Sequence, residues 1–241
     1  MQPANRPLFV NQVLAALPPD EVALLRPHMT RSNMVNAQTL HEPGERIDQV
    51  YFFETGFASM VAVADDAGAA VEVGLAGWDS MVGLAVVLNP EAKAFNLSMV
   101  QYPGVAYRMP TPALLACLDR APVLRRTLLR KAEVLHAQVA QTAACNSRHS
   151  LAQRCARWLL LAHDRTEGDE LRLTQEFLSL MLAVRRSGVT VAMQALQGSG
   201  FVKSGRGRIL VCNRPGLEGA ACECYGRVRA FAADALETTK A

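Results

Sequence analysis

The spacing of apolar residues changes along the chain, and each change predicts a different kind of structure. Residues 8–26 contain two short helical patterns separated by Pro18 and Pro19, with Asp20 as a cap for the second. From about Met29 to Arg108 the apolar residues form short β-prone runs between turn residues. The predicted strands are 39–41, 50–53, 57–63, 70–75, 97–101 and 105–109, with turns at 43–44, 56, 65–68, 77, 89–90 and 103–104. Many short strands with close turns indicate a sandwich or a β-roll.

Helical spacing returns after residue 110. It predicts a short helix over 111–118, a long helix from Pro122 to about Asn146 and a third helix over 151–163. The long helix carries two stripes. One stripe has the three-and-four spacing of a coiled-coil seam and is predicted to pair with a second protomer; it comprises Leu124, Leu128, Lys131, Leu135, Gln138, Thr142 and Cys145. The other is predicted to pack on the roll and comprises Leu129, Ala132, His136, Val139 and Ala143.

Residues 173–210 combine a helix, a tight turn, a second helix and a glycine-rich hairpin. Thr174 is a suitable N-cap, and Ala183 and Val184 fill the turn. The second helix repeats apolar residues at helical spacing from Val189 to Leu196, which leaves its first turn polar and basic. The hairpin turn at 204–207 contains two glycines, as a wing requires. This order predicts a winged helix-turn-helix.

Positive charge is concentrated in this stretch. Five basic residues and one acid, Glu176, lie between Thr174 and Leu210, which gives 5 − 1 = +4, whereas the whole chain is only +3. A surface that faces DNA phosphates needs such a concentration. We expect Arg185, Arg186 and Ser187 to reach base edges, with Thr190 near them. The residues expected to hold phosphates are Thr174, Lys203, Arg206 and Arg208.

The same stretch resembles the C-terminal domain of the cAMP receptor protein and fumarate–nitrate regulator (CRP/FNR) superfamily. The motifs that carry the resemblance are LTQE, VRRSGVTVAMQALQGSGFV and GRGRIL, with a continuation through Cys222-Glu223-Cys224-Tyr225. Gly188 departs from relatives that often carry a side chain there, so we expect one contact to be absent. The 39–88 region also looks like the superfamily's cyclic-nucleotide-binding roll; its turns and buried aromatic correspond to Gly44, Tyr51, Gly56, Gly68, Asp79 and Gly83.

The resemblance implies an α+β fold with two domains. A β-roll with flanking helices is expected over 1–120, a dimerisation helix over 121–146 and the winged helix-turn-helix over 147–241. The cyclic-nucleotide residues differ, however. Relatives that bind cyclic nucleotides have a glutamate after the glycine that matches Gly83, and an arginine and a serine later; here those positions are Leu84, Ala94 and Phe95. Because a buried phosphate needs a cationic partner, we predict no tight binding of cAMP or cGMP. The apolar run 81–88 is predicted to fill the roll, with a pocket for a less polar ligand as the alternative.

Composition is that of a soluble globular protein, since half the residues are hydrophobic and a fifth are charged. No apolar run is long enough to cross a membrane and the N-terminus lacks a signal-peptide core, so we expect a cytoplasmic protein. The six cysteines are expected to be buried thiols. A metal or redox site at Cys212, Cys222 and Cys224 is disfavoured, because alternate helix positions face apart and no histidine is close in sequence. An iron–sulfur sensor is disfavoured because the first cysteine is Cys117.

These features predict a homodimeric transcription regulator that binds an inverted-repeat operator in double-stranded DNA. RNA polymerase is a further candidate partner, and no membrane, cofactor or metal is expected; the sequence does not identify an effector. The alternative is a ligand-sensing module that acts through a protein partner. An enzyme is excluded, because His28, His41 and nearby acids lack metal-binding spacing and no nucleophile–base set stands out.

Overall fold

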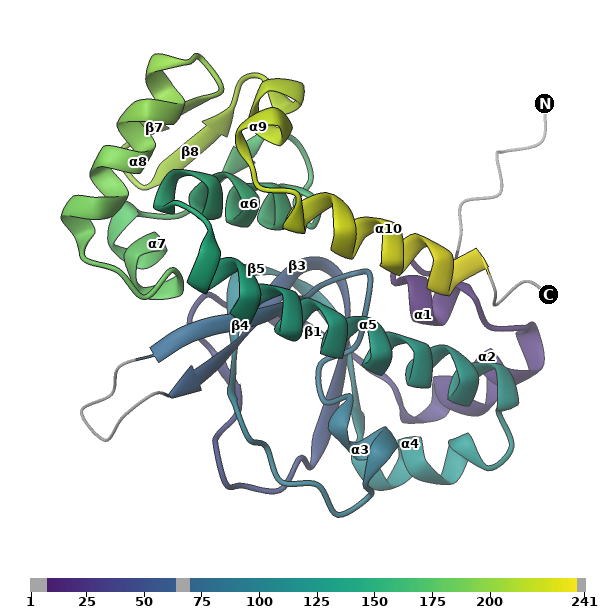
Figure 1. Ribbon diagram of the computed structural model, residues 1–241. Coiled ribbons are helices and arrows are strands. Elements are labelled where there is room, and N and C mark those ends of the chain that lie inside the picture. Colours follow the sequence, from purple (N-terminus) through teal and green to yellow (C-terminus); the bar gives the residue numbers. More distant parts are fainter. Residues whose placement is uncertain (1–7, 64–69, 238–241) are drawn as a thin grey trace, which may run out of the picture.

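The computed structural model of the chain describes residues 8–63 and 70–237. An N-terminal antiparallel roll and a C-terminal helical domain are joined by one long helix, α5 (Pro122–Arg148) (Figure 1). The fold is the predicted α+β arrangement. The predicted turn at 65–68, including Gly68, lies outside the described residues.

The chain enters the roll through short helices. These are α1 (Gln12–Ala15), α2 (Pro19–Leu25) and a 3-10 turn (Arg26–His28). Asn11 caps α1 by accepting hydrogen bonds from Val13 and Leu14. Asp20 lies in the first turn of α2, whose N-cap is Pro18, so the predicted cap is displaced by two residues.

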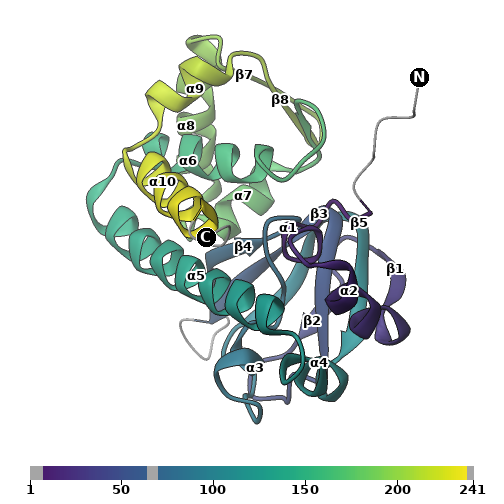
Figure 2. The same ribbon diagram turned by 90° about the vertical axis from the view of Figure 1, so that its right-hand side faces the viewer.

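The roll is built on one antiparallel sheet. Its strands are β1 (Thr30–Met34), β2 (Thr39–His41), β3 (Gln49–Val63), β4 (Ala70–Ala76) and β5 (Leu97–Pro110). The order is β1-β5-β3-β4, and β2 pairs with β5. Helix α3 (Ala85–Leu88) and helix α4 (Thr111–Leu118) lie at the end of the roll shown below α5 in Figure 2.

Two predicted turns are in fact irregularities inside long strands. Gly56 has φ +75° and lies within β3, and Pro103-Gly104 lies within β5. The pairing of β3 with β5 shifts register on both sides of Thr55. A Cβ at Gly56 would lie 2.5 Å from the carbonyl oxygen of Tyr102, so glycine permits the close crossing of the two strands. Strand β1 has no counterpart among the predicted strands.

The C-terminal domain has the predicted order of elements. It comprises α6 (Leu151–His163), β6 (Glu170–Leu171), α7 (Gln175–Met181), α8 (Arg186–Gly198), β7 (Val202–Gly205), β8 (Arg208–Val211), α9 (Arg214–Ala220) and α10 (Cys224–Glu237). His149 ends α5, and Ser150 caps α6 with a capping box. Helix α10 continues past Phe231 to Glu237 and lies along α5 in both views (Figures 1 and 2).

The two domains share a continuous hydrophobic core. Phe57, Val61 and Leu75 of the roll belong to the same buried cluster as Trp158 and Leu161 of α6. A second cluster fills the roll between its strands and the first half of α5. Met81, Val82, Leu84 and Val86 are buried, whereas Ala85 and Leu88 are exposed, so the apolar run 81–88 fills the roll only in part.

Candidate DNA-binding surface

Helix α7 and the turn after it are fixed by local bonds. The hydroxyl of Thr174 accepts a hydrogen bond from the backbone N–H of Phe177 at 3.1 Å, so Thr174 is the N-cap that the sequence predicts. Ala183 in the turn has φ +51°, a left-handed conformation that L-residues rarely adopt. Arg154 of α6 donates a 2.7 Å bond to the carbonyl of Leu182 and so holds this turn in place. The sequence alone does not reveal this role of Arg154, because its partner lies 28 residues away.

Helix α8 buries the expected apolar face and exposes a basic first turn. Val189, Ala192, Met193 and Leu196 are buried, and α8 packs on α6. A Cβ at Gly188 would lie 2.9 Å from Cδ2 of Leu151, so the glycine permits close packing on α6. Position 188 therefore faces α6, so the lack of a side chain at Gly188 removes nothing from the exposed face of α8.

The exposed face of α8 carries three of the residues predicted to reach bases. Arg185, Arg186 and Ser187 are all exposed. Val191, one turn beyond Ser187, is 67% exposed, and the sequence analysis passed over it. An apolar side chain at such a position can contact the methyl group of thymine.

Thr190 is held more tightly than the sequence suggests. Its hydroxyl lies 3.1 Å from both Oε1 of Gln175 and the carbonyl of Arg186. Gln175 in turn lies 3.5 Å from the hydroxyl of Ser204, and Gln197 accepts a 2.8 Å bond from the backbone of Ser204. These bonds link α7, α8 and β7, so Thr190 helps to fix α8 relative to the wing.

The wing presents cations beside α8. Strands β7 and β8 pair from Val202↔Val211 to Gly205↔Arg208, and Gly207 in the turn has φ +72°. Lys203, Arg206 and Arg208 are exposed. Arg208 and Arg172 each lie 3.7 Å from the carboxylate of Glu170, as exposed pairs that solvent and salt weaken. Arg172 is a further cation on this side, outside the set predicted from the sequence.

In Figure 1 the surface formed by α7, α8 and the β7–β8 wing lies at the end of the molecule opposite α2 and α4. Exposed arginines on a helix can make paired bonds to guanine in the major groove, while wing cations hold the phosphate backbone. The arrangement suits a duplex, with α8 as the element that enters the groove.

The roll has no cationic side chain at positions 84, 94 and 95, which correspond to the phosphate- and ribose-binding positions of related rolls. Leu84 and Ala94 are buried and Phe95 is 89% exposed. The Ala94 backbone is bound to the opposite loop, since its N–H donates to Glu45 and its carbonyl accepts from Gly44, both at 2.8 Å. This segment is therefore occupied by the protein's own hydrogen bonds and apolar packing.

A separate cavity of about 350 Å³ lies where the roll, α5, α6 and α10 meet. Its charged lining comprises Asp79, Lys131, Asp164, Arg165 and Arg229. Lys131 donates a 3.1 Å bond to Gln12, and burial lowers the pKa of its ammonium group, although the charge of Asp79 opposes that shift. The space is bounded by elements of both domains.

The two stripes of α5 face opposite to the sequence prediction. Leu124, Leu128, Lys131, Gln138 and Thr142 are buried, and Leu135 is partly buried. They pack against the roll and the rest of the protomer, so the prediction that they form the dimer seam is wrong for this fold. The stripe predicted to pack on the roll is the more open one: Leu129 is 43% exposed, His136 and Ala143 are exposed, and Ala132 and Val139 are half-buried.

Residues 153–220 match the family model of the Crp-like helix-turn-helix domain. Known structures with a similar fold include FixK2 from Bradyrhizobium japonicum, with a TM-score of 0.68 and 15% identity, covering 80% of this chain and 98% of that one. Another is the c-di-GMP-responsive global regulator CLP of Xanthomonas campestris, with a TM-score of 0.63, 14% identity and coverage of 80% and 98%. A third is a CRP/FNR-family transcriptional regulator from Thermus thermophilus, with a TM-score of 0.58 and 20% identity, covering 80% of this chain and 98% of that one. No curated protein matches the sequence.

Within the described residues, no helix has both the length and the apolar character needed to cross a bilayer.

Proposed function

We propose that this chain, a CRP/FNR-type transcription regulator by its Crp-like helix-turn-helix domain and its two-domain fold, binds an inverted-repeat DNA site as a homodimer. The observation that carries the proposal is the exposed basic first turn of α8 beside a basic wing. Arg185, Arg186 and Ser187 read base edges, and Thr174, Lys203, Arg206 and Arg208 hold phosphates. Thr190 stays near the bases, and its hydroxyl also fixes α8 to α7.

The dimer is proposed to form through the open stripe of α5. Leu129, Ala132, His136, Val139 and Ala143 are spaced three, four, three and four residues apart, which is the spacing of a coiled-coil seam. In the proposed dimer the two α5 helices pair in parallel on this face, so that both α8 helices lie at the same end of the dimer. Two such helices in one dimer fit half-sites about one helical turn of DNA apart, and a two-fold axis requires the operator to be an inverted repeat.

Cyclic AMP is not proposed as the effector. The buried Leu84 and Ala94 leave the roll without a glutamate or an arginine at the positions that related rolls use, and a phosphate placed there would lack a cation. The regulator acts in the cytoplasm, where it meets duplex DNA, and RNA polymerase is a further proposed partner for the DNA-bound dimer.

Selection of bound fragments from the source genome tests the proposal. The full chain is mixed with sheared genomic DNA at several salt concentrations, and retained fragments are sequenced. Enrichment of a common inverted repeat supports it. Salt-sensitive binding without any enriched sequence contradicts it and favours the alternative, a sensing module that acts through a protein partner.

A further inference from the structure

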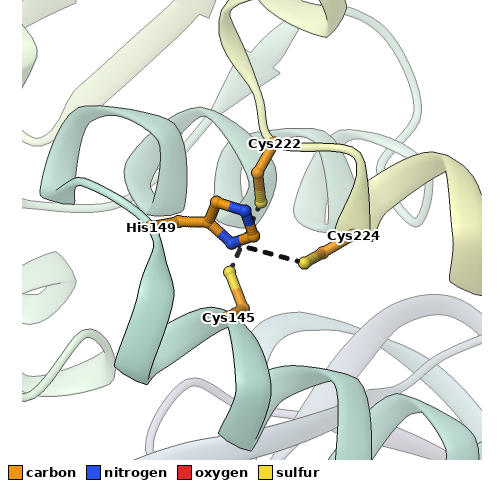
Figure 3. Close-up of side chains that lie close together, drawn as sticks. All are labelled: Cys145, His149, Cys222 and Cys224. Atoms are coloured by element: carbon orange, nitrogen blue, oxygen red, sulfur yellow. Dashed lines mark hydrogen bonds between the residues drawn. The ribbon is translucent and has the colours of Figure 1, made fainter.

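Four potential metal ligands meet at the junction between α5 and α10. Cys145 and His149 lie one helical turn apart at the end of α5, Cys222 lies in the connection before α10, and Cys224 is the first residue of α10 (Figure 3). Their ligand atoms all lie within 4.8 Å of one another. Cys145 Sγ is 3.4 Å from Cys222 Sγ, and Cys224 Sγ is 3.5 Å from His149 Nδ1.

These separations suit a single tetrahedral ion. Zinc binds thiolate sulfur at about 2.3 Å and imidazole nitrogen at about 2.0 Å, so on one tetrahedral zinc ion two sulfurs lie roughly 3.8 Å apart and a sulfur and a nitrogen roughly 3.5 Å apart. The 3.5 Å distance between Cys224 Sγ and His149 Nδ1 matches that geometry, and the Cys145 and Cys222 sulfurs, at 3.4 Å, need to separate only slightly to bind the same ion. Three sulfurs and one nitrogen form a complete structural zinc set, with no position left for water.

The surroundings of the cluster resemble those of a metal site more than those of an apolar core. Cys145, Cys222 and Cys224 form a small buried cluster of their own, separate from the three larger hydrophobic clusters. Nε2 of His149 lies 3.5 Å from the carboxylate of Glu223, and a carboxylate behind the second ring nitrogen is the usual support for a metal-bound histidine. Gln141 donates a 3.0 Å bond to Cys224 Sγ, which suits a thiolate acceptor.

Cations beside the cluster offset the net negative charge of a zinc ion bound by three thiolates. One zinc ion with three thiolates and a neutral imidazole has a net charge of −1. The positive charges of Arg154 and Arg157 both act on Cys145. Arg157 is only 6% exposed, and its Nε has no hydrogen-bond partner among the described residues. A buried guanidinium with an unpaired donor is costly unless a negative group lies nearby.

We propose that Cys145, His149, Cys222 and Cys224 bind one Zn²⁺ ion. The three thiols release their protons to solvent as the zinc–sulfur bonds form, and no oxidant is needed. A Cys145–Cys222 disulfide is the competing arrangement, but it uses only two of the four groups and gives no role to the His149–Glu223 pair. Cys212, considered with the CxC pair from sequence alone, is exposed and does not belong to the site.

The ion ties together segments about 75 residues apart in the chain. α5 carries the proposed dimer face, and α10 follows the winged helix-turn-helix, so the site fixes the placement of the DNA-binding domain on α5. This consequence rests on the proposed function. Loss of zinc is expected to weaken DNA binding by loosening that placement.

Metal analysis of the reduced full chain tests the site. Protein expressed with zinc is expected to retain one ion per chain. Cys224→Ser and His149→Ala are expected to lose it, while Cys212→Ser, which removes an exposed thiol outside the cluster, keeps it. Glu223→Gln is expected to bind zinc roughly 10-fold more weakly or worse, because it removes the support for His149. Zinc content in the wild type no higher than in Cys224→Ser overturns the proposal.

Cobalt substitution keeps the test independent of whether the variants fold. Wild-type chain stripped of zinc and titrated with Co²⁺ is expected to show the visible bands of tetrahedral cobalt and a thiolate-to-cobalt charge-transfer band, saturating at one ion per chain. Absence of both bands, or recovery of a Cys145–Cys222 disulfide from protein kept under reductant, overturns the site.

DNA binding is measured separately from metal binding. Zinc bound without any sequence-specific DNA binding refutes the proposed function alone, whereas unchanged DNA affinity in Cys224→Ser refutes only the coupling.

Discussion

The indole N–H of Trp158 in α6 donates a 2.8 Å hydrogen bond to the carboxylate of Glu72 in β4. Ser59 donates to the other oxygen of that carboxylate at 2.7 Å. The bond crosses from the DNA-binding domain to the roll, inside the core that the two domains share. Burial raises the pKa of Glu72 to about 7, although both hydrogen bonds act to lower it. The domain contact therefore contains a group that titrates near neutral pH.

We predict that packing of the domains weakens as the pH rises toward and above 7. The folded chain holds a proton on Glu72 that the unfolded chain releases above pH 4.5, so the stability due to this group is complete below that value and falls through the folded pKa. The loss amounts to roughly 3 kcal/mol at most. Glu72→Gln should reduce the fall in unfolding free energy between pH 5 and pH 8, measured by urea denaturation. The exposed Glu167→Gln serves as the control, and an equal pH dependence in wild type and Glu72→Gln would refute the assignment.

Arg186→Ala and Lys203→Ala should weaken DNA binding in different ways. Arg186 is proposed to bond a base edge, so its loss should cost about 1 to 3 kcal/mol on the specific site and relax discrimination. Lys203 is proposed to hold a phosphate, so its loss should weaken all duplexes alike and reduce the salt dependence by about one ion. Fluorescence anisotropy on the specific site and on random duplex distinguishes the two. Equal losses on both duplexes for Arg186→Ala would show that it reads no base.

Leu129→Arg should shift the chain from dimer to monomer. Pairing of two α5 helices on the open stripe places one Leu129 from each protomer at the interface, and two buried cations there would lack partners. We expect the dissociation constant of the dimer to rise roughly tenfold or more, measured by sedimentation equilibrium. Leu88→Arg is the matched control, since Leu88 is 68% exposed on α3 and lies outside the open stripe of α5. If Leu129→Arg remains as dimeric as the control, the interface lies elsewhere.

Calorimetric titration with cAMP should show no binding at micromolar concentrations. The reason is the absence of a cation and a glutamate at positions 84, 94 and 95 of the roll. The same titration with cGMP should give the same result. A saturable heat at one ligand per chain, with a dissociation constant of about micromolar, would contradict the account of the roll.

Local signals in the sequence predicted most of the helices. Thr174 is a cap with a short-range partner, and apolar spacing located α6 and α8. The strands were predicted in pieces, because Gly56 and Gly104 mark a close crossing of β3 and β5 and were interpreted as turns. Turn residues alone do not distinguish the end of a strand from an irregularity within it.

Features that depend on distant contacts escaped the sequence. Both stripes of α5 have coiled-coil spacing, and only the position of the roll shows that Leu124 and Leu128 face inward. The hydroxyl of Thr190 is bound by Gln175, 15 residues away. The cysteine–histidine cluster joins residues about 75 positions apart, because α10 lies along α5. The four-residue spacing of Cys145 and His149, together with the CxC pair, was the signal that could have indicated it.

The central claim is that two α8 helices of one dimer read successive major grooves of a single duplex. Anisotropy titration with the selected inverted repeat, compared with the same duplex carrying one scrambled half-site, tests it most directly. We predict two chains per duplex and an affinity for the intact repeat at least about tenfold higher. Binding of one chain per duplex, or equal affinity for both duplexes at every salt concentration, would contradict the claim.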